Sequence, residues 1–284
     1  MTWTQFAQPE NIFSLAALDN GGCLAGSDQG LWAWQPKKKQ WQPFATQFST
    51  VPISAVAAAG QTMLIGSNGD IAYSNDAGKN WTLASLVVKS HVFGLAVSPN
   101  FANDHIALAA TAQDGVLRSP DGGESWYAWN FGLLDLSVNS LVFSPNFAED
   151  DTVFAGTELG VFMSQNQGRA WREVGFPNAQ GPVVALSVAA NDTLLAATEG
   201  HGLWTAQTPY QDWSPVAAIE ADGVNAIVAQ NRSNVIATTG GIFSGNSSDK
   251  WRRLSKIEDA VSLAVLTEGM LVVGTAGSGI WQDL

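Results

Sequence analysis

A short turn that ends in tryptophan recurs along this chain of 284 residues. Its clearest copies are SNDAGKNW (74–81) and SPDGGESW (119–126), which share the pattern Ser-x-Asp-x-Gly-x-x-Trp. SQNQGRAW (164–171) has asparagine in place of the aspartate, and SGNSSDKW (244–251) has lost the glycine. We call these four segments the tryptophan turns. Sequence repeats with a period of about 20–50 residues are typical of solenoids and propellers, so this feature constrains the fold more than any other.

The tryptophans that end such turns are evenly spaced. They occupy positions 41, 81, 126, 171, 213 and 251, with spacings of 40, 45, 45, 42 and 38 residues. Trp3 is followed by similar residues, and it lies 36 residues from Trp251 when the count passes through the C-terminus. The repeat is therefore predicted to be circular. Trp3 is expected to open the outer strand of a seventh unit, paired with a strand near residues 279–284.

Each unit also contains apolar runs in a fixed order. In the first unit they are IFSLAAL (12–18), CLAGS (23–27), LWAW (31–34) and the segment that Trp41 opens. Four short strands in each of seven units, with little helical periodicity, predict an all-β fold. The expected architecture is a single seven-bladed β-propeller (1–284) of four-stranded antiparallel blades, closed by pairing of the N-terminal strand with the C-terminal blade. The predicted blades cover residues 11–44, 51–85, 91–130, 138–175, 183–217, 224–256, and 260–284 together with 1–8.

The first run of each unit is predicted to be the innermost strand of its blade. When the seven runs are aligned, one position always holds a small residue: Ser14, Ser54, Gly94, Ser140, Ala185, Ala226 and Ser262. The blades converge towards the axis, where close packing makes larger side chains costly.

The residues of the tryptophan turns are predicted to be structural. An aspartate such as Asp121 can accept backbone N–H groups across the turn, and Gly123 can supply a positive φ. Trp126 is expected to open the outer strand and to pack against the neighbouring sheet. The predicted structural set is Ser74, Asp76, Gly78, Trp81, Ser119, Asp121, Gly123, Trp126, Ser164, Asn166, Gly168, Trp171, Ser244, Asn246 and Trp251.

The tryptophan turns at 74–81 and 119–126 resemble the Asp-box, or BNR repeat. This repeat occurs in sialidases, xyloglucanase-type glycosidases, sortilin-type receptors and the photosystem II assembly and stability factor. The resemblance extends over the whole chain and implies the propeller fold, on which functions differ widely. As a single seven-bladed propeller, the chain resembles the photosystem factor and sortilin-type propellers more than sialidases.

The resemblance does not extend to the catalytic features of the related enzymes. Sialidases of this kind use three arginines and a tyrosine nucleophile. Here arginine occurs only at 118, 169, 172, 232, 252 and 253, and tyrosine only at 73, 127 and 210. Most of these arginines adjoin tryptophan turns, at the opposite end of the blade from a sialidase pocket. Xyloglucanase-type enzymes use a cleft between two propellers, and the photosystem factor relies on a basic patch that is not visible here.

Composition excludes several other classes. The formal net charge is −12, with 25 acidic and 13 basic residues, which argues against a nucleic-acid partner. The single cysteine, Cys23, rules out a disulfide framework within the chain and is expected to be a small buried apolar residue. No segment approaches the ~18 apolar residues of a membrane span, and the N-terminus does not resemble a signal peptide. We therefore expect a cytoplasmic protein without a membrane span.

The loops between the second and third strands surround one mouth of the predicted channel. Five consecutive blades place an acid there, and two histidines lie at the same end: the candidate ligand-binding residues are Asp28, Asp70, His91, Asp114, Glu158, Glu199 and His201. Asp-Gly and similar pairs are also ordinary hairpin residues. As an acidic funnel, the set could hold a divalent cation or provide acid and base groups.

Two functions follow from these observations. The favoured one is a non-catalytic scaffold that binds a protein or a small ligand at one face of the propeller, with no cofactor. The alternative is a lyase or hydrolase that uses the acidic funnel. An ordered cation among the five acids would favour the enzyme, and acids scattered outwards around a shallow rim would favour the scaffold.

Overall fold

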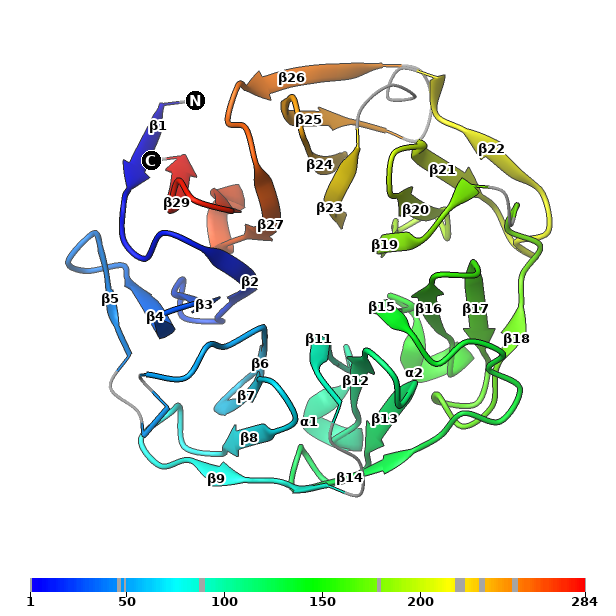
Figure 1. Cartoon of the computed structure of the whole chain (residues 1–284), viewed down its shortest axis with the longest axis horizontal. Coiled ribbons are helices and arrows are strands. Elements are labelled where there is room, and N and C mark those ends of the chain that lie inside the picture. The colour runs from blue at the N-terminus through cyan, green and yellow to red at the C-terminus, as the bar shows by residue number, and fades with distance from the viewer. Residues whose placement is uncertain are drawn as a thin grey trace.

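The structure of the chain is a computed structural model, which describes residues 2–44, 47–48, 50–86, 90–177, 180–217, 223–229, 233–246 and 250–283. Seven small sheets form a ring, seen along its axis in Figure 1. Each sheet has four strands joined in antiparallel order, and one sheet carries an additional short strand. The prediction of an all-β, seven-bladed propeller is confirmed.

The first three blades follow one another along the chain. Blade one contains β2 (Ile12–Ala17), β3 (Cys23–Ser27), β4 (Gly30–Gln35) and β5 (Gln40–Pro43). Blade two contains β6 (Ala55–Ala59), β7 (Thr62–Gly66), β8 (Ile71–Ser74) and β9 (Thr82–Leu83). Blade three contains β11 (Val92–Val97), β12 (Ala107–Thr111), β13 (Val116–Ser119) and β14 (Ser125–Ala128), with β10 (Ser85–Leu86) parallel to β14.

The next three blades repeat the arrangement. Blade four contains β15 (Val138–Phe143), β16 (Val153–Thr157), β17 (Val161–Ser164) and β18 (Arg172–Glu173). Blade five contains β19 (Val183–Val188), β20 (Leu194–Thr198), β21 (Gly202–Ala206) and β22 (Trp213–Pro215). Blade six contains β23 (Val224–Ala229), β24 (Asn234–Thr238), β25 (Gly241–Gly245) and β26 (Trp251–Ser255).

The seventh blade joins the two ends of the chain. It contains β27 (Ala260–Val265), β28 (Leu271–Thr275), β29 (Ile280–Asp283) and, outermost, β1 (Trp3–Phe6). β1 is antiparallel to β29, with Trp3 opposite Asp283 and Phe6 opposite Ile280. Figure 1 shows the N- and C-termini close together in this blade. The predicted position of Trp3 and the predicted closure of the ring are both confirmed.

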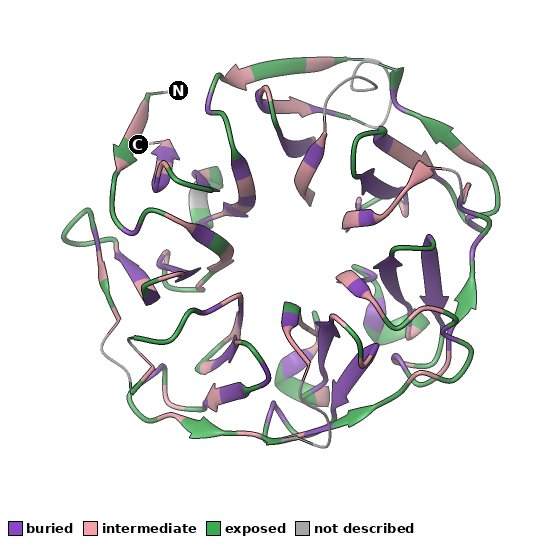
Figure 2. Cartoon of the chain, viewed as in Figure 1, coloured by how far each residue is buried: buried purple, intermediate pink, exposed green. Residues whose placement is uncertain are grey.

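The core lies between neighbouring blades. Figure 2 shows buried residues within the blades, and exposed residues in the loops and along the perimeter. The second strands β3, β12, β16, β20, β24 and β28 are buried at every position. Cys23, at the start of β3, is buried as predicted. Trp126 is completely buried in a cluster with Leu64 and Ile71 of blade two, so its predicted packing against the neighbouring sheet is also confirmed.

The tryptophan turn of blade three is held by the groups that its sequence predicts. Asp121 Oδ1 accepts a hydrogen bond from Ser125 N at 3.0 Å, and Gly123 has a φ of 100°. The serine has a larger role than predicted, because Ser119 Oγ donates to Asp121 Oδ1 and accepts from Gly123 N, both at 2.8 Å. Trp126 Nε1 donates to Gly123 O at 3.0 Å.

Two other turns repeat the hydrogen bonds of the serine. Ser74 Oγ donates to Asp76 Oδ1 at 2.8 Å and accepts from the backbone N–H of Gly78 at 2.9 Å. Ser164 Oγ donates to Asn166 Oδ1 at 2.9 Å, so an asparagine oxygen can replace the carboxylate. In the turn of blade six, residues 247–249 lie outside the described residues.

The loops divide between two faces of the ring. The tryptophan turns lie on one face, which we call the lower face, with the loops that join the first and second strands. Those loops contain the single-turn helices α1 (Phe101–Asp104) and α2 (Phe147–Asp150) and the 3₁₀ turn η3 (Thr267–Gly269). The upper face carries the loops between second and third strands and the connections from each blade to the next. None of the helices among the described residues has the length and apolar character to cross a membrane.

Candidate functional site

A cavity of about 650 Å³ opens on the upper face, at the mouth of the ring between blades seven, one, two and three. Its walls are mainly apolar, and its polar groups come from the loops of blades two and three. The lining residues are Ile12, Phe13, Val51, Pro52, Ser54, Ser67, Asn68, Asp70, His91, Phe93, Val261 and Ala276. We call this space the mouth cavity.

A β-bulge in the innermost strand explains which side chains reach the mouth. In six blades the register between the first two strands shifts by one residue, which leaves one residue of the inner strand without a partner. These extra residues are Phe13, Phe93, Asn139, Val184, Asn225 and Val261. Three of them line the mouth cavity.

In blade two the equivalent residue is the small Ser54, directly before β6. In four blades the residue that begins the inner segment lies against a glycine of the preceding blade: the pairs are Ile12 and Gly274, Ile53 and Gly26, Val92 and Gly66, and Val183 and Gly156. By this criterion Ile53 is equivalent to Ile12. Ala55 pairs with Gly66 as Ser14 pairs with Gly26, so Ser54 is equivalent to Phe13, and the predicted alignment of Ser54 with Ser14 is wrong by one residue.

The small side chain of Ser54 leaves room for the mouth cavity. Phe13 of blade one and Phe93 of blade three stand on either side of blade two, and both are nearly half exposed. Between them blade two presents only Ser54, whose hydroxyl donates to Val92 O at 2.7 Å. The cavity therefore has two aromatic walls and, in place of a third bulky side chain, a small residue already engaged by the fold.

The polar edge of the mouth cavity lies on the side of blades two and three. Asn68 and His91 form an isolated antiparallel bridge, which ties the loop of blade two to the segment that enters β11. The His91 ring stacks edge-on against Phe93, with ring centroids 5.2 Å apart. Asp70 is exposed beside them. One imidazole, one amide and one carboxylate thus border an apolar space.

The structure places four of the seven predicted site residues at or beside this cavity. Asp70 and His91 line it. Asp28 contacts the lining indirectly, through Asn11. Its Oδ2 accepts a hydrogen bond from the Asn11 side chain at 2.8 Å, and Asn11 forms a backbone bridge with Ala276 of the lining.

Asp114 lies on the other flank of the cavity. Its Oδ2 accepts a hydrogen bond from the backbone N–H of Ser90, the residue before His91, at 2.9 Å. Both flanking carboxylates therefore fix the segments that carry lining residues.

The other three predicted residues lie apart from the cavity. Glu158 accepts a hydrogen bond from Ser137 Oγ at 3.1 Å on the exposed surface of blade four. Glu199 and His201 are exposed in blade five, where His201 Nδ1 lies 3.2 Å from Glu199 O. In the part of the chain that the structure describes, no three His, Cys, Asp or Glu side chains come together in a way that could hold a metal ion. The seven residues do not form one acidic funnel.

Glu158 and Glu199 lie apart from the cavity because their loops belong to blades four and five, whereas the cavity lies between blades seven, one, two and three. All five acidic loops join second and third strands, and neighbouring strands are about 4.8 Å apart, so each loop begins well outside the innermost strand. Side chains of the inner strands lie nearer the axis. The sequence analysis missed Phe13, Phe93 and Val261 for this reason. The usable signal was the small residue Ser54 at the position where blades one and three have phenylalanine.

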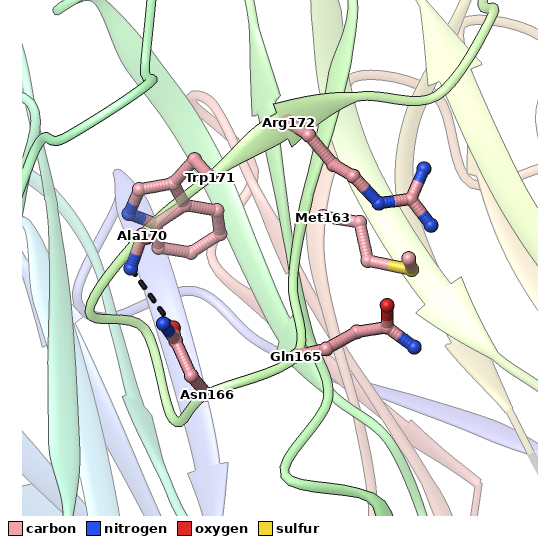
Figure 3. A pocket seen from close by; sticks show the side chains of 6 residues that line it. All are labelled: Met163, Gln165, Asn166, Ala170, Trp171 and Arg172. Carbon is pink, nitrogen blue, oxygen red and sulfur yellow. Dashed lines mark hydrogen bonds between the residues drawn. The ribbon is translucent and has the colours of Figure 1, made fainter.

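A smaller cavity of about 200 Å³ lies at the tryptophan turn of blade four (Figure 3). It is lined by Met163, Gln165, Asn166, Ala170, Trp171 and Arg172. Asn166 Oδ1, the acceptor drawn in Figure 3, is already bound to Ala170 N at 2.9 Å. The described hydrogen bonds of this cavity thus belong to the turn, which agrees with a structural role.

Neither protein-family profiles nor curated protein sequences match the chain. Solved propellers resemble it in structure. The structure described as YCF48 bound to D1 peptide has a TM-score of 0.76 at 12% identity, covering 100% of this chain and 94% of that one. YCF48 from Cyanidioschyzon merolae has a TM-score of 0.71 at 15% identity, covering 99% of this chain and 98% of that one.

An enzyme of the GH74 class resembles the chain to a similar degree. The xyloglucanase from Xanthomonas campestris has a TM-score of 0.77 at 16% identity and covers 99% of this chain. This chain covers 53% of the xyloglucanase, or about half its length. The three likenesses show the fold. They agree with the predicted resemblance to photosystem-factor and xyloglucanase-type propellers at the level of architecture.

Proposed function

We propose that this protein is a non-catalytic binding scaffold whose mouth cavity receives an apolar side chain of a peptide. The observation that carries the proposal is the pair of partly exposed phenylalanines, Phe13 and Phe93, that face the gap left in blade two. A structural neighbour that covers nearly the same length, YCF48, is described as bound to a peptide. That description supports a binding role for a single propeller of this size.

The size and the walls of the mouth cavity suit an apolar anchor. Ligand sites are typically concave spaces of about 300–1,000 Å³, lined mostly by apolar groups with a few polar groups that orient the ligand. An aromatic or aliphatic side chain placed between Phe13 and Phe93 would remove apolar surface from water, which is worth about 25 cal/mol per Å². Buried apolar anchors of this kind dominate the energy of many interfaces.

The polar edge of the cavity supplies orientation. Asn68 can both donate and accept hydrogen bonds, as a peptide backbone requires, and the His91 ring can do the same in its neutral form. Asp70 places a carboxylate beside the apolar space, so the preferred peptide carries a positive charge or an N–H donor next to its apolar anchor.

The lyase or hydrolase alternative has weaker support. Among the residues that line the mouth cavity, the ionisable side chains are Asp70 and His91. An acid–base mechanism requires groups within hydrogen-bond reach of one another or of a shared substrate atom. Among the described contacts, these two side chains are not joined by a hydrogen bond. The scaffold therefore stays the favoured function.

Selection from a random peptide library tests the proposal directly. Peptides selected on the unmodified protein should bind a Phe13→Ser/Phe93→Ser variant at least tenfold more weakly, a loss of about 1.4 kcal/mol. Leu83→Ser is the matched control, because Leu83 is another exposed apolar residue and lies on the outer strand β9. Selected peptides that bind the double variant as tightly as the unmodified protein would contradict the proposal.

A further inference from the structure

A second apolar surface lies between blades three and four, along the connection from β14 to β15 and the neighbouring loop of blade four. It consists of Trp129, Phe131, Leu134, Leu136 and Leu159, which we call the apolar strip. Phe131 is 82%, Leu134 73% and Leu159 56% exposed. The strip shares no residue with the mouth cavity. Large apolar side chains grouped at this level of exposure mark interaction sites on soluble proteins.

The backbone beneath the apolar strip is firmly held. At its outer end Phe131 O accepts a hydrogen bond from Trp171 N at 2.8 Å, and at its inner end Leu136 O accepts one from Gly115 N at 3.0 Å. Between them, Asp135 Oδ2 accepts from Leu159 N at 3.1 Å, which ties the strip's two segments together. Because the backbone is fixed, a partner would meet apolar side chains that are already positioned, with a reduced entropic cost of binding.

The exposure of the strip is specific to certain positions. Leu133, next to Leu134, is buried in the core between blades three and four, together with Phe162 and Trp171. The connecting segment thus contributes one leucine to the core and directs the next one outwards. Leu133 anchors the segment in the core, and the exposed Leu134 is additional to that anchor.

The charge around the inner part of the apolar strip is negative. The neighbouring loops carry Asp114, Asp135 and Glu158, and the chain contains no lysine or arginine between Arg118 and Arg169. Arg118 is buried and donates to Gln167 O, in the tryptophan turn on the lower face. At the outer end of the strip, where Phe131 forms a bridge with Ala170, Arg169 and Arg172 are exposed.

We propose that the apolar strip is a docking surface for a basic amphipathic segment of another protein, recognised by apolar side chains along the strip and by cations opposite Glu158, Asp135 and Asp114. Charge selects this occupant. A second copy of the chain would bring an equally acidic surface and a net charge of −12. An anionic membrane surface would be repelled in the same way.

The test uses the full chain and a short synthetic helical peptide made of leucine and lysine. A Leu134→Ser/Leu159→Ser variant should bind this peptide at least tenfold more weakly than the unmodified protein, as measured by calorimetry. Glu158→Gln should weaken binding to a smaller extent, and higher salt should weaken it further. A peptide of the same pattern made of leucine and glutamate should not bind.

Two control variants separate this site from others. Leu83→Ser removes an equally exposed leucine elsewhere and should leave binding unchanged. The Leu134→Ser/Leu159→Ser change should cause the same loss in the Phe13→Ser/Phe93→Ser background, where the mouth cavity cannot contribute, so a failure of the mouth-cavity proposal is distinguishable from a failure of this one. Equal binding of the leucine–lysine peptide to the strip variant would overturn the proposal. Self-association that depends on Leu134 would overturn the proposal in favour of a second copy of the chain. Binding to anionic vesicles that depends on Leu134 would overturn it in favour of a membrane surface.

Discussion

At the scale of single residues, the carboxylates of the tryptophan turns show which chemical group the repeated turn requires. Asp76 accepts hydrogen bonds from the backbone N–H of Asn80 at 2.8 Å and from its side chain at 2.6 Å. These bonds, chiefly the backbone one, lower the pKa of Asp76 from 3.8 to about 2. In blade four Asn166 has the same position and receives the same kind of backbone bond, so the turn requires an oxygen acceptor more than a charge.

The lowered pKa of Asp76 predicts a loss of stability in acid. Since the folded pKa lies below the unfolded one, the stabilisation is complete above about pH 4 and disappears as the pH falls towards 2. An Asp76→Asn variant keeps the acceptor but cannot titrate. Its free energy of unfolding, measured by urea denaturation, should therefore fall less steeply between pH 5 and pH 2 than that of the unmodified protein. Parallel curves for the two proteins would show that Asp76 does not contribute to acid sensitivity.

At the scale of the element, the innermost strand of blade two decides where a ligand can enter. Ser54 occupies the position that holds a larger residue in the other six blades, and its small side chain leaves the mouth cavity open. Aligning the seven strands at a small residue placed Ser54 with Ser14, whereas the strand pairing places Ala55 there. Both residues are small, so the sequence pattern alone did not fix the register of blade two.

Enlarging Ser54 should close the mouth cavity. A Ser54→Phe variant would give blade two the same residue as blades one and three at this position, with the new ring placed between Phe13 and Phe93. The neutral dye Nile red, which fluoresces in apolar sites, should bind this variant at least tenfold more weakly than the unmodified protein. Circular dichroism should confirm that the β-structure is retained. Undiminished dye binding by the folded variant would show that the gap in blade two is not what opens the cavity.

The sequence predicted the sheets better than the site, for a physical reason. The tryptophans are core residues with regular spacing, so their positions report the blades directly, as Trp126 shows. Acids such as Glu158 and Glu199 were grouped because their loops share one face. These loops belong to blades four and five, whereas Asp70 and His91 belong to blades two and three at the cavity, so a shared face did not imply proximity.

At the scale of the whole molecule, the ring is held closed by one strand from the opposite end of the chain. Besides the pairing of β1 with β29, Thr2 N donates to Asp283 Oδ1 at 3.0 Å and Gln5 Nε2 donates to Ser278 O at 3.0 Å. Phe6 packs edge-on against Trp34 of blade one, with ring centroids 5.6 Å apart. β1 therefore contacts both sides of the junction between blades seven and one.

Removal of residues 1–8 should destabilise the whole ring. The deletion removes the partner of β29 and the apolar contacts of Trp3 and Phe6. Loss of one large core side chain alone costs about 3–5 kcal/mol, and an unpaired strand edge adds to this. The melting temperature should fall on the order of 10 °C, measured by calorimetry. An unchanged melting temperature would mean that β1 is dispensable for closure.

The small residue at position 54 of blade two also has a consequence for symmetry. A ring of seven equivalent blades would offer a ligand at the axis seven indistinguishable orientations, and none would be preferred. Ser54 removes that degeneracy, because the opening beside it exists at one azimuth only. A ligand at the mouth therefore meets a ring with a defined direction, and the expected stoichiometry at the mouth is one ligand per chain.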